Sequence, residues 1–541
     1  MPVSHPVRTL VGLVAALMLG ACSAPTPPGA APGATAGGEA AAPTELVLAD
    51  GQDLGGYNPI RGYGELGVSP LYDGLLRLAS SGDDRLPELE PALAGAPPVA
   101  NADSTVWYVT LRDGVTFHDG STFDAADVVA TYRAVLDPAS ASEIASSFDM
   151  LDSVEATAHN SVRFRLKYPY VDFPARLLLA IAPSQMLTPG PAESSSLNRQ
   201  PVGTGPYRLA ELTPERAVFT ANEAYWGGAP QVKKLTTVYL PDDNSRAQRM
   251  TAGEIDGTNL PPALAGTFAD RPGVSVDAVK SADWRGVSLP ANSAFAKEPA
   301  ARLALNLAAD RATMVEKILA GHGRVAATPV SSVYGGAFVA DEFPHDAQRA
   351  GALLDAAGWT VGSDGIRRKG DQVARFTLAY NPTDTLRRDL ATAFAADVKR
   401  IGVDVRLEGL SFDQIEQRIG DLAILLGGGD KPYSIDTQVF GALHTKVAGA
   451  SPWDNPGGFG TPARDAALEQ ARRTANRGER DAMYRSVQTD YLADPSAVYL
   501  VFLDHTYVSK SDGWKRGPRV VEPHSHGVAW GPWWDLAAWS K

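Results

Sequence analysis

Cysteine is almost absent from this chain: Cys22 is the only one among 541 residues. A single thiol excludes an internal disulfide framework, a Cys-x-x-Cys redox pair and a zinc site built from cysteines. The Gly-x-Ser-x-Gly elbow, the His-Glu-x-x-His zinc motif and the Walker phosphate loop are missing as well. These motifs mark common hydrolases, metalloproteases and nucleotide-dependent enzymes, so the sequence predicts no catalytic residue and no cofactor.

Long hydrophobic runs are also scarce. The apolar stretch from Leu10 to Leu19 follows Arg8 and is too short to span a bilayer with any margin. It leads into Leu19-Gly20-Ala21-Cys22, which resembles the bacterial lipoprotein signal, in which the cysteine is lipidated after cleavage. We therefore expect residues 1–21 to be a signal peptide and Cys22 to carry a lipid; a plain secretory signal is the alternative. Residues 22–43 are mostly Ala, Pro, Gly and Thr and predict a flexible tether.

Basic residues are outnumbered by acidic ones. The chain has 49 Lys and Arg against 62 Asp and Glu, which gives a formal net charge of −13. Because nucleic acids are bound through clustered Lys and Arg, this balance argues against a nucleic-acid partner. A hydrophobic fraction of 44% is ordinary for a globular protein, and the length allows two to four domain-sized units.

Strand and helix patterns alternate along most of the chain. Val106 to Leu111 is rich in β-branched and aromatic residues, and Val162 to Leu166 alternates apolar and charged residues, as half-buried strands do. Between them, Asp124 followed by Asp127 predicts the start of a helix, which Pro138 ends. This alternation predicts an α/β fold.

Three patterns suggest chemistry, but each has a simpler interpretation. Residues 62–67 match Gly-x-Gly-x-x-Gly without the strand-to-helix context of a dinucleotide site, so a glycine-rich loop lining a cleft is the better account. His524 and His526 would share one face of a strand but lack a nearby third ligand, which favours loop histidines over a metal site. His118-Asp119 precedes Gly120 in an expected turn, where a structural role outweighs acid–base catalysis.

Several segments carry a more specific signal. They are Leu111–Gly120 with Phe123–Val128, Pro201–Tyr207 with Asn222–Gly228, Gly253–Asp256, and Leu353–Trp359. In order and spacing these segments resemble the large extracellular solute-binding proteins of peptide, opine and nickel ABC importers, solute-binding protein family 5. The resemblance extends from about residue 57 to residue 510.

The resemblance implies an α/β fold of the type II periplasmic-binding-protein kind, with two hinged lobes, central mixed sheets and an extra subdomain in the first lobe. We expect residues 44–285 to form the first lobe, with the subdomain at about 75–200. Residues 286–505 would then form the second lobe, and residues 506–541 would return to the first.

It also implies a function. Such a protein traps a small solute between its lobes and then docks on the permease subunits of an ABC transporter. We expect a monomer at the extracytoplasmic face of the cell membrane, held by the lipid anchor. The alternative from another class is a secreted enzyme on the same scaffold.

The solute is left open by the sequence, with short peptides favoured over a metal chelate. Asp430 or Asp436 could hold a peptide ammonium group. Pro432-Tyr433 resembles a pattern of the nickel-type members, whereas Ser434-Ile435 departs from it. His444 is the tentative metal ligand if the solute is a nickel or other metal chelate.

The other expected ligand contacts lie in three places. Arg61 and Tyr63 belong to a first-lobe loop that lines the cleft in the family, and Trp284 and Arg285 precede a break in the pattern near the expected hinge. Tyr433 completes the set. For each of them the simpler interpretation is a packed or solvated side chain.

Overall fold

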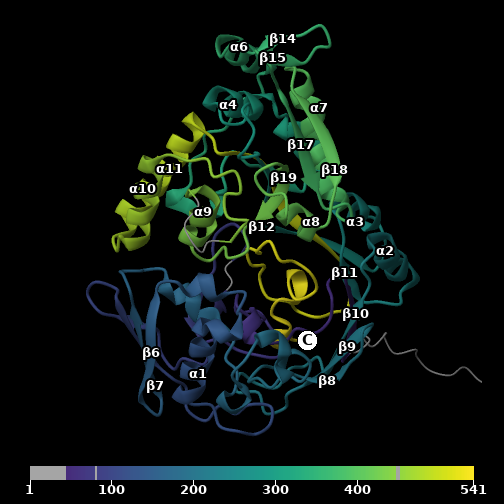
Figure 1. Cartoon of the computed structure of the whole chain (residues 1–541). Helices are drawn as coiled ribbons and strands as arrows, with labels where there is room; N and C mark the ends of the chain where they lie inside the picture. Colours follow the sequence, from purple (N-terminus) through teal and green to yellow (C-terminus); the bar gives the residue numbers. More distant parts are fainter. Residues whose placement is uncertain (1–43, 80–81, 446–450) are drawn as a thin grey trace, which may run out of the picture. The chain divides into compact units, whose positions relative to one another are not determined.

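A computed structural model describes residues 44–79, 82–445 and 451–541. The expected signal peptide, the tether and the lipidated Cys22 lie outside these residues. Strands and helices alternate along the described chain, which confirms the predicted α/β class (Figure 1). None of the helices in the described ranges is long and apolar enough to cross a membrane.

One large mixed sheet runs through both halves of the described chain. Its strand order is β18-β17-β19-β12-β20-β11-β1-β10-β9-β8, with β13 paired to β20. The strands are β1 (Glu45–Asp50), β8 (Tyr207–Leu212), β9 (Arg216–Ala221), β10 (Lys234–Tyr239), β11 (Gly257–Asn259), β12 (Val274–Ser288), β13 (Gly323–Val325), β17 (Arg375–Tyr380), β18 (Asp404–Gly409), β19 (Ala423–Gly428) and β20 (Ala497–Lys510). Strand β1 pairs in parallel with β10 and β11, and β17 with β18 and β19, while the other neighbours are antiparallel.

The long strands β12 and β20 join the two halves. Their register pairs Lys280 with Asp504 and resumes with Trp284 opposite Phe502, so that residues 281–283 stand opposite a single residue of β20. Such a bulge bends a strand pair and increases its twist. The lobe boundaries expected from the sequence, after residues 285 and 505, fall inside these two strands.

The first half has its own hydrophobic core. Side chains from Leu46 to Leu235 pack there with those of the C-terminal segment, including Trp530, Trp533 and Trp539. Its remaining elements are β2 (Leu76–Ala79), β3 (Glu88–Pro91), β4 (Val99–Ala100), β5 (Val106–Thr110), β6 (Leu151–Ala158), β7 (Ser161–Leu166), α1 (Ala125–Leu136), α2 (Asp243–Ala252) and α3 (Pro262–Ala265). Strands β4, β5, β7 and β6 form a separate four-stranded sheet.

Helix α1 shows how the sequence sets local structure. The carboxylate of Asp124 accepts the backbone N–H of Ala126 at 2.7 Å, and that of Asp127 accepts the N–H of Asp124 at 2.9 Å. This reciprocal cap satisfies amide groups that the first helical turn leaves unpaired. The helix buries Val128 and Tyr132 against the core. The helix predicted after Asp124 is therefore confirmed, as are the two predicted strands on either side of it, β5 and β7.

The second half packs around a separate core between Ala282 and Val521. Its helices and small strands are α4 (Pro299–Ala308), α5 (Arg311–Thr313), α6 (Ala347–Ala356), α7 (Thr385–Lys399), α8 (Phe412–Glu416), α9 (Ile435–Leu443), α10 (Pro462–Arg473), α11 (Arg477–Ala493), β14 (Thr360–Val361), β15 (Arg367–Lys369) and β16 (Gln372–Val373). Helices α7 to α10 and the strands β12 and β19 position the candidate site described below.

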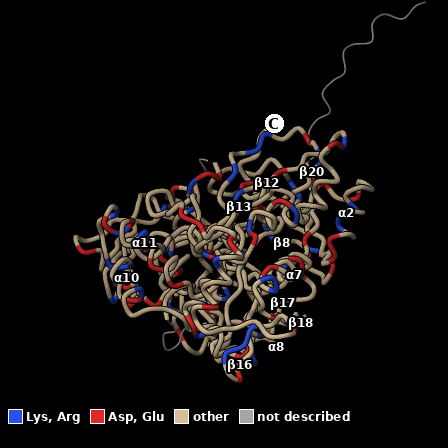
Figure 2. The backbone as a smooth tube through the Cα atoms, turned by 90° about the horizontal axis from the view of Figure 1, so that it is seen from above, with Lys and Arg blue, Asp and Glu red and all other residues tan. Residues whose placement is uncertain are grey.

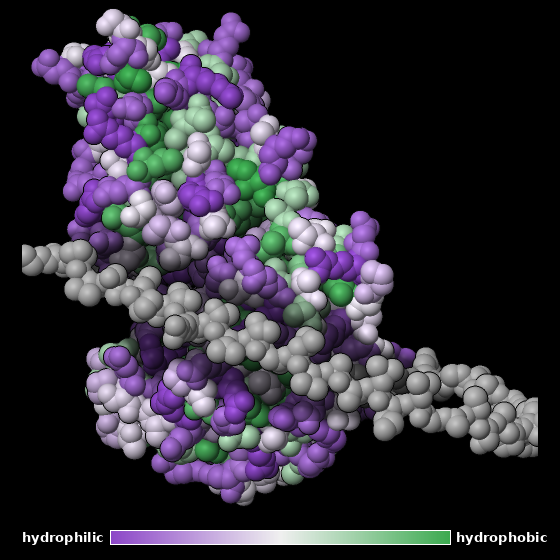
Figure 3. Space-filling view, turned by 90° about the vertical axis from the view of Figure 1, so that its right-hand side faces the viewer, coloured by the Kyte–Doolittle hydropathy of each residue, from purple (hydrophilic) through white to green (hydrophobic). Residues whose placement is uncertain are grey.

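Basic and acidic residues are interspersed along the described chain, and apolar areas are scattered over one face of the molecule. Figure 2 shows basic and acidic residues interleaved along the chain. Figure 3 shows green hydrophobic areas separated by hydrophilic residues on the face that it draws.

Candidate ligand-binding site

A cavity of about 1060 Å³ lies between the two halves. The first half contributes Ser146, Ser147, Asp149, Met150, Tyr168 and Arg176. The rest of the lining comes mainly from β12, β19, β20, α7 to α10, the segment 451–456 and His524. Ligand sites of proteins favour such inter-domain clefts. The volume exceeds that of most small-molecule pockets, which measure roughly 300–1000 Å³. It therefore suits a solute of several residues together with water.

Three glycines shape the inner wall, where β19 pairs with β12. A Cβ atom on Gly428 would collide with the indole of Trp284, and one on Gly427 would come within 2.5 Å of the ring of His524. Gly429 has a φ of +105°, and a Cβ atom there would collide with the carbonyl oxygen of Ala282. Only glycine fits such close approaches. The run of glycines thus allows Trp284 and His524 to reach the cavity wall.

The lining carries charges of both signs. Its basic residues are Arg176, Arg387, Lys431, Arg472 and Arg473. Its acidic residues are Asp149, Asp413, Glu416, Asp430, Asp454 and Glu469. A lining of this kind can pair with both ends of a zwitterion.

Of the predicted ligand contacts, Trp284, Asp430 and His444 line the cavity. Trp284 packs edge-on against Tyr499, with ring centroids 4.8 Å apart. Its indole N–H is buried and has no hydrogen-bond partner among the described residues. An unpaired buried donor of this kind is unfavourable.

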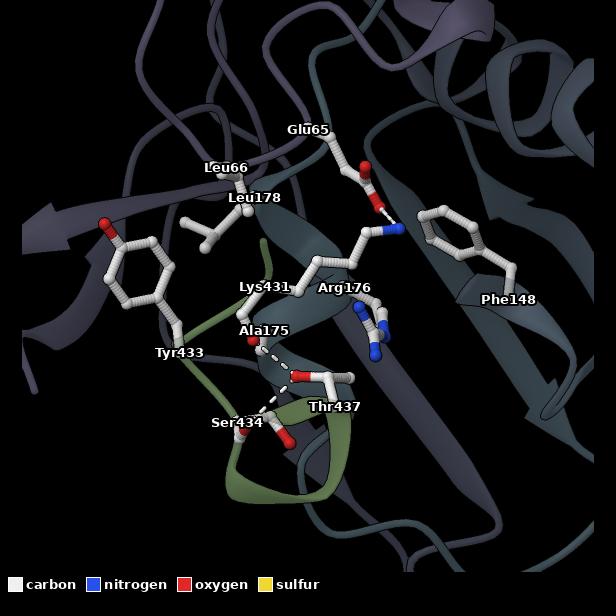
Figure 4. Close-up of a pocket in the computed structure, with 10 residues that line it drawn as sticks. All are labelled: Glu65, Leu66, Phe148, Ala175, Arg176, Leu178, Lys431, Tyr433, Ser434 and Thr437. Atoms are coloured by element: carbon white, nitrogen blue, oxygen red, sulfur yellow. Dashed lines mark hydrogen bonds and ion pairs between the residues drawn. The ribbon is translucent and has the colours of Figure 1, made fainter. Parts of the chain in front are cut away.

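The loop that follows Asp430 is held by the first half. The Lys431 ammonium group pairs with Glu65 at 2.8 Å and also contacts the hydroxyl of Ser147. Figure 4 shows Lys431 reaching Glu65 across a small pocket beside Tyr433. The Tyr433 hydroxyl donates a hydrogen bond of 3.0 Å to the carbonyl of Val521, and the ring packs against the hydrophobic core of the first half. Tyr433 therefore anchors the loop and does not line the large cavity, so its contact with a ligand stays a prediction.

Asp436 is buried behind the cavity wall and does not line it. Its carboxylate accepts hydrogen bonds from Arg472 at 2.9 and 3.1 Å and from the Tyr170 hydroxyl at 3.2 Å. Burial opposes the charge of Arg472, but the Asp436 carboxylate outweighs it and raises the pKa of the guanidinium above its usual value. The guanidinium also lies 3.5 Å from the ring centre of Phe440. Asp436 thus orients Arg472, which lines the cavity.

His444 lines the cavity with both ring nitrogens near acceptors. Its Nδ1 lies 2.5 Å from the carbonyl oxygen of Thr445, and its Nε2 lies 3.4 Å from the carboxylate of Glu469. The ring stacks on Phe440 at a centroid distance of 4.6 Å. No group of three or more His, Cys, Asp or Glu residues able to hold a metal ion occurs within residues 44–79, 82–445 and 451–541.

The remaining predicted contacts lie elsewhere. Arg61 pairs with Glu143 at 2.6 Å, and Tyr63 packs edge-on against Tyr57 at a centroid distance of 5.1 Å. Arg285 is only 3% exposed and pairs with Asp283 behind the cavity wall. The structure does not bring these side chains into the cavity lining, so their contact with a ligand stays a prediction.

Arg387 is a lining residue that sequence reasoning missed. The guanidinium donates to the carbonyl of Leu425 at 2.9 Å and to Asp384 at 3.0 Å. Burial and the nearby Arg285 lower the pKa of Arg387 to about 10. Its one sequence signal is its place in the first turn of α7, where the helix dipole disfavours a cation.

The patterns that suggested chemistry have structural roles. Residues 62–67 form turns in which Gly62 ends a short 3₁₀ helix, with a φ of +100°. The Nε2 atom of His118 lies 3.0 Å from the carbonyl oxygen of Gly205, and burial lowers the pKa of His118 to about 4. A neutral imidazole fixed to the backbone agrees with the structural interpretation of the His118 turn.

Comparison with known proteins identifies relatives along nearly the whole chain. The family model described as bacterial extracellular solute-binding proteins, family 5 middle, matches residues 88–448. Protein XP55 of Streptomyces lividans is 39% identical over 515 residues, which cover 94% of this chain and 92% of that protein. The oligopeptide-binding protein AppA of Bacillus subtilis is 28% identical over 344 residues, which cover 61% of this chain and 63% of that protein.

A solved structure supports the same relationship. NikZ from Campylobacter jejuni, crystallised in complex with Ni(L-His), is 26% identical in sequence and superposes with a TM-score of 0.81. The match covers 92% of this chain and 99% of NikZ. It confirms the predicted α/β fold of the type II periplasmic-binding-protein kind, with two lobes and mixed sheets.

Proposed function

Because the chain belongs to family 5 of the bacterial extracellular solute-binding proteins, which deliver solutes to ABC importers, we propose that it captures short peptides in the cavity between its lobes. The size of this cavity and the presence of both basic and acidic residues in its lining carry the proposal. A short peptide brings an ammonium group, a carboxylate and backbone polar groups, and all of them need partners once they are removed from water.

The lining offers a partner for each end of a peptide. Asp430 can accept from the ammonium group, while Arg387 and Arg472 are cations that a carboxylate can approach. AppA of Bacillus subtilis, a relative named for oligopeptide binding, supports this assignment. Waters in a cavity of this volume would accommodate different peptide side chains.

Isothermal titration calorimetry with trialanine, pentaalanine and the Ni(L-His) chelate tests the proposal. We expect the peptides to bind with one site per chain and the chelate to bind more weakly. Binding of the chelate alone would replace the peptide assignment. Binding of none of these probes would count against both ligands.

Asp430→Asn is expected to weaken trialanine binding about tenfold or more. The variant removes the negative charge, and a hydrogen bond to a charged group contributes about 1.5–3 kcal/mol. Asp413→Asn is the matched control, because Asp413 also lines the cavity but lies on α8. If both variants bind trialanine like the wild type, Asp430 does not hold the ammonium group.

A nickel or other metal chelate is the second candidate, and the likeness to NikZ in complex with Ni(L-His) favours it. In this case His444, on the cavity wall, would be the metal ligand once its ring leaves Thr445 and Glu469. Loss of chelate binding in His444→Gln, with peptide binding unchanged, would support this role.

The proposal also covers placement and assembly. The protein acts as a monomer without catalysing a reaction, with residues 44–285 and 506–541 as one lobe and 286–505 as the other. A lipid on Cys22 holds it at the extracytoplasmic face of the cell membrane.

Cys22→Ser is expected to move the protein from the membrane fraction to the medium or periplasm, as measured by cell fractionation. Equal membrane retention of both forms would contradict the lipid anchor.

A further inference from the structure

Buried ionisable groups gather where the two lobes are joined. Asp283 lies in the bulge of β12, His505 lies on β20, and Glu522 lies in the C-terminal segment that runs beside them. Asp283 and Glu522 are fully buried, and His505 is 5% exposed. Charges are rarely removed from water unless they are paired, so this cluster calls for a physical explanation.

The imidazole of His505 bridges the two carboxylates. Its Nδ1 lies 2.7 Å from Glu522, and its Nε2 lies 3.2 Å from Asp283. A histidine can donate through both ring nitrogens only as the imidazolium, and a carboxylate beside each nitrogen favours that form. Tyr507 and the backbone N–H of Gly531 also donate to Glu522, at 2.6 and 2.7 Å.

One of these carboxylates, that of Asp283, contacts a residue of the cavity lining. The Nδ1 atom of His524, a residue of the cavity lining, lies 2.7 Å from Asp283, and Arg285 pairs with the same carboxylate. An unbroken chain of polar contacts thus runs from His524 through Asp283 and His505 to Glu522.

Backbone hydrogen bonds join the C-terminal segment to β12 and to the residue after β19 beside this cluster. The N–H of Ala282 donates to the carbonyl of Glu522 at 2.8 Å, and the N–H of Glu522 donates to Lys280 at 3.0 Å. The N–H of His524 donates to Gly429 at 3.0 Å. These amides report directly on whether β12, β19 and the C-terminal segment stay together.

The surroundings shift the pKa values of two histidines of the cluster in opposite directions. Burial opposes the charge of His505, but hydrogen bonds to Asp283 and Glu522 more than offset burial and raise the pKa of His505 to about 9. The ring centroid of His526 is 4.6 Å away, and burial together with the charge on His505 holds the pKa of His526 well below its usual value. The further charged and titratable groups facing the cluster are Asp50 on β1, Arg387 on α7, Tyr433 in the loop after β19, and Asp504 on β20.

We propose that Asp283, His505 and Glu522 form a protonation-dependent clamp on the hinge. With His505 protonated, the clamp holds β12, β20 and the C-terminal segment in one arrangement. When His505 loses its proton, the two carboxylates repel each other. The backbone hydrogen bonds that join β12, β19 and the C-terminal segment then weaken, and the cavity wall that contains His524 is no longer fixed. The consequence for ligand affinity rests on the proposed function.

The direction of the pH dependence follows from His505. Because its pKa in the folded protein lies above the ordinary value of 6.5, its stabilising contribution is complete below pH 6.5 and is lost as the pH rises through about 9.

Amide hydrogen exchange of the ligand-free mature protein tests the clamp. In His505→Gln at pH 7 we expect the amides of Ala282, Glu522 and His524 to exchange at least about tenfold faster. The pKa of His505 is raised from 6.5 to about 9, and one pKa unit alone corresponds to a factor of about ten. His159→Gln is the matched control, because His159 is 74% exposed and pairs with Asp124 far along the chain. Exchange in His505→Gln equal to that in this control would overturn the clamp.

The wild-type protein provides a test that does not depend on the folding of the variant. After correction for intrinsic rates, exchange at the same three amides should accelerate as the pH rises through about 9. Nitrogen-15 spectra should show both ring nitrogens of His505 protonated at pH 7. A neutral His505 at pH 7, or exchange that does not respond to pH, would refute the proposal.

Calorimetry with trialanine at pH 7 and pH 10 tests the link to binding. We expect weaker binding at pH 10 in the wild type and at pH 7 in His505→Gln. Unchanged affinity together with faster exchange would show that the clamp does not reach the ligand. If trialanine does not bind at pH 7, the peptide assignment fails, while the exchange experiment still decides on the clamp.

Discussion

Gly429→Ala is expected to destabilise the protein strongly and to reduce ligand binding. Its φ of +105° is unfavourable for alanine, and such backbone strain costs about 1–3 kcal/mol. The new methyl group would also collide with the carbonyl of Ala282 in the neighbouring strand, and overpacking of this kind adds about 1–3 kcal/mol. The free energy of unfolding from urea denaturation measures the sum.

Gly228→Ala separates the two contributions. Gly228 has a similar φ of +101°, but a Cβ atom on it would meet nothing within 4 Å. This control should therefore show the backbone strain without the collision. Equal destabilisation by both substitutions would mean that β19 and β12 can move apart at no cost, against the close packing described here.

Asp436→Ala is expected to lower the free energy of unfolding by about 3–5 kcal/mol, the usual loss when one partner of a buried ion pair is removed. The substitution leaves the Arg472 guanidinium without its carboxylate and the Tyr170 hydroxyl without its acceptor. Peptide affinity should fall as well, because Arg472 would no longer be oriented towards the cavity. Thermal or urea denaturation and calorimetry with trialanine measure the two effects.

The exposed pair Asp364–Arg368 provides the comparison. Both side chains are at least 40% exposed, at a nitrogen–oxygen distance of 2.7 Å, and exposed pairs contribute roughly 0–1 kcal/mol. Asp364→Ala should therefore change stability little. A loss of less than about 1 kcal/mol in Asp436→Ala would show that water or another group replaces the buried pair.

The fold follows from signals that are local in the sequence. The cap of α1 depends on Asp124 and Asp127, three residues apart, so the spacing alone predicts the start of the helix. The paired strands β5 and β7 likewise show their character in their own residues. The motifs of the family add the order of the elements, which local patterns do not contain.

The cavity lining was predicted only in part, because its contacts are distant in the sequence. Trp284 was expected at the ligand because it precedes the break near the expected hinge, and Asp430 because it could hold a peptide ammonium group. Arg472, by contrast, is placed by Asp436, 36 residues away. Asp436 itself was expected to contact the ligand, and its carboxylate lies behind the cavity wall. A carboxylate that contacts a ligand and one that orients an arginine have the same local sequence signal.

The cluster of Asp283, His505 and Glu522 had no predictive signal of its own. Asp283 and His505 are 222 residues apart, and the interpretation of His524 and His526 as loop histidines did not include the contact of His524 with the β12 bulge. Such contacts appear only when β12, β20 and the C-terminal segment are brought side by side (Figure 1).

Native mass spectrometry of the protein isolated from its producing cells tests most directly the claim that the cavity traps a small solute without transforming it. We expect one small molecule per chain, released on denaturation, and we expect an added peptide such as trialanine to bind and to be recovered intact. Recovery of a cleaved or otherwise altered peptide would contradict the account. So would a chain that carries no solute and takes up neither trialanine nor a metal chelate.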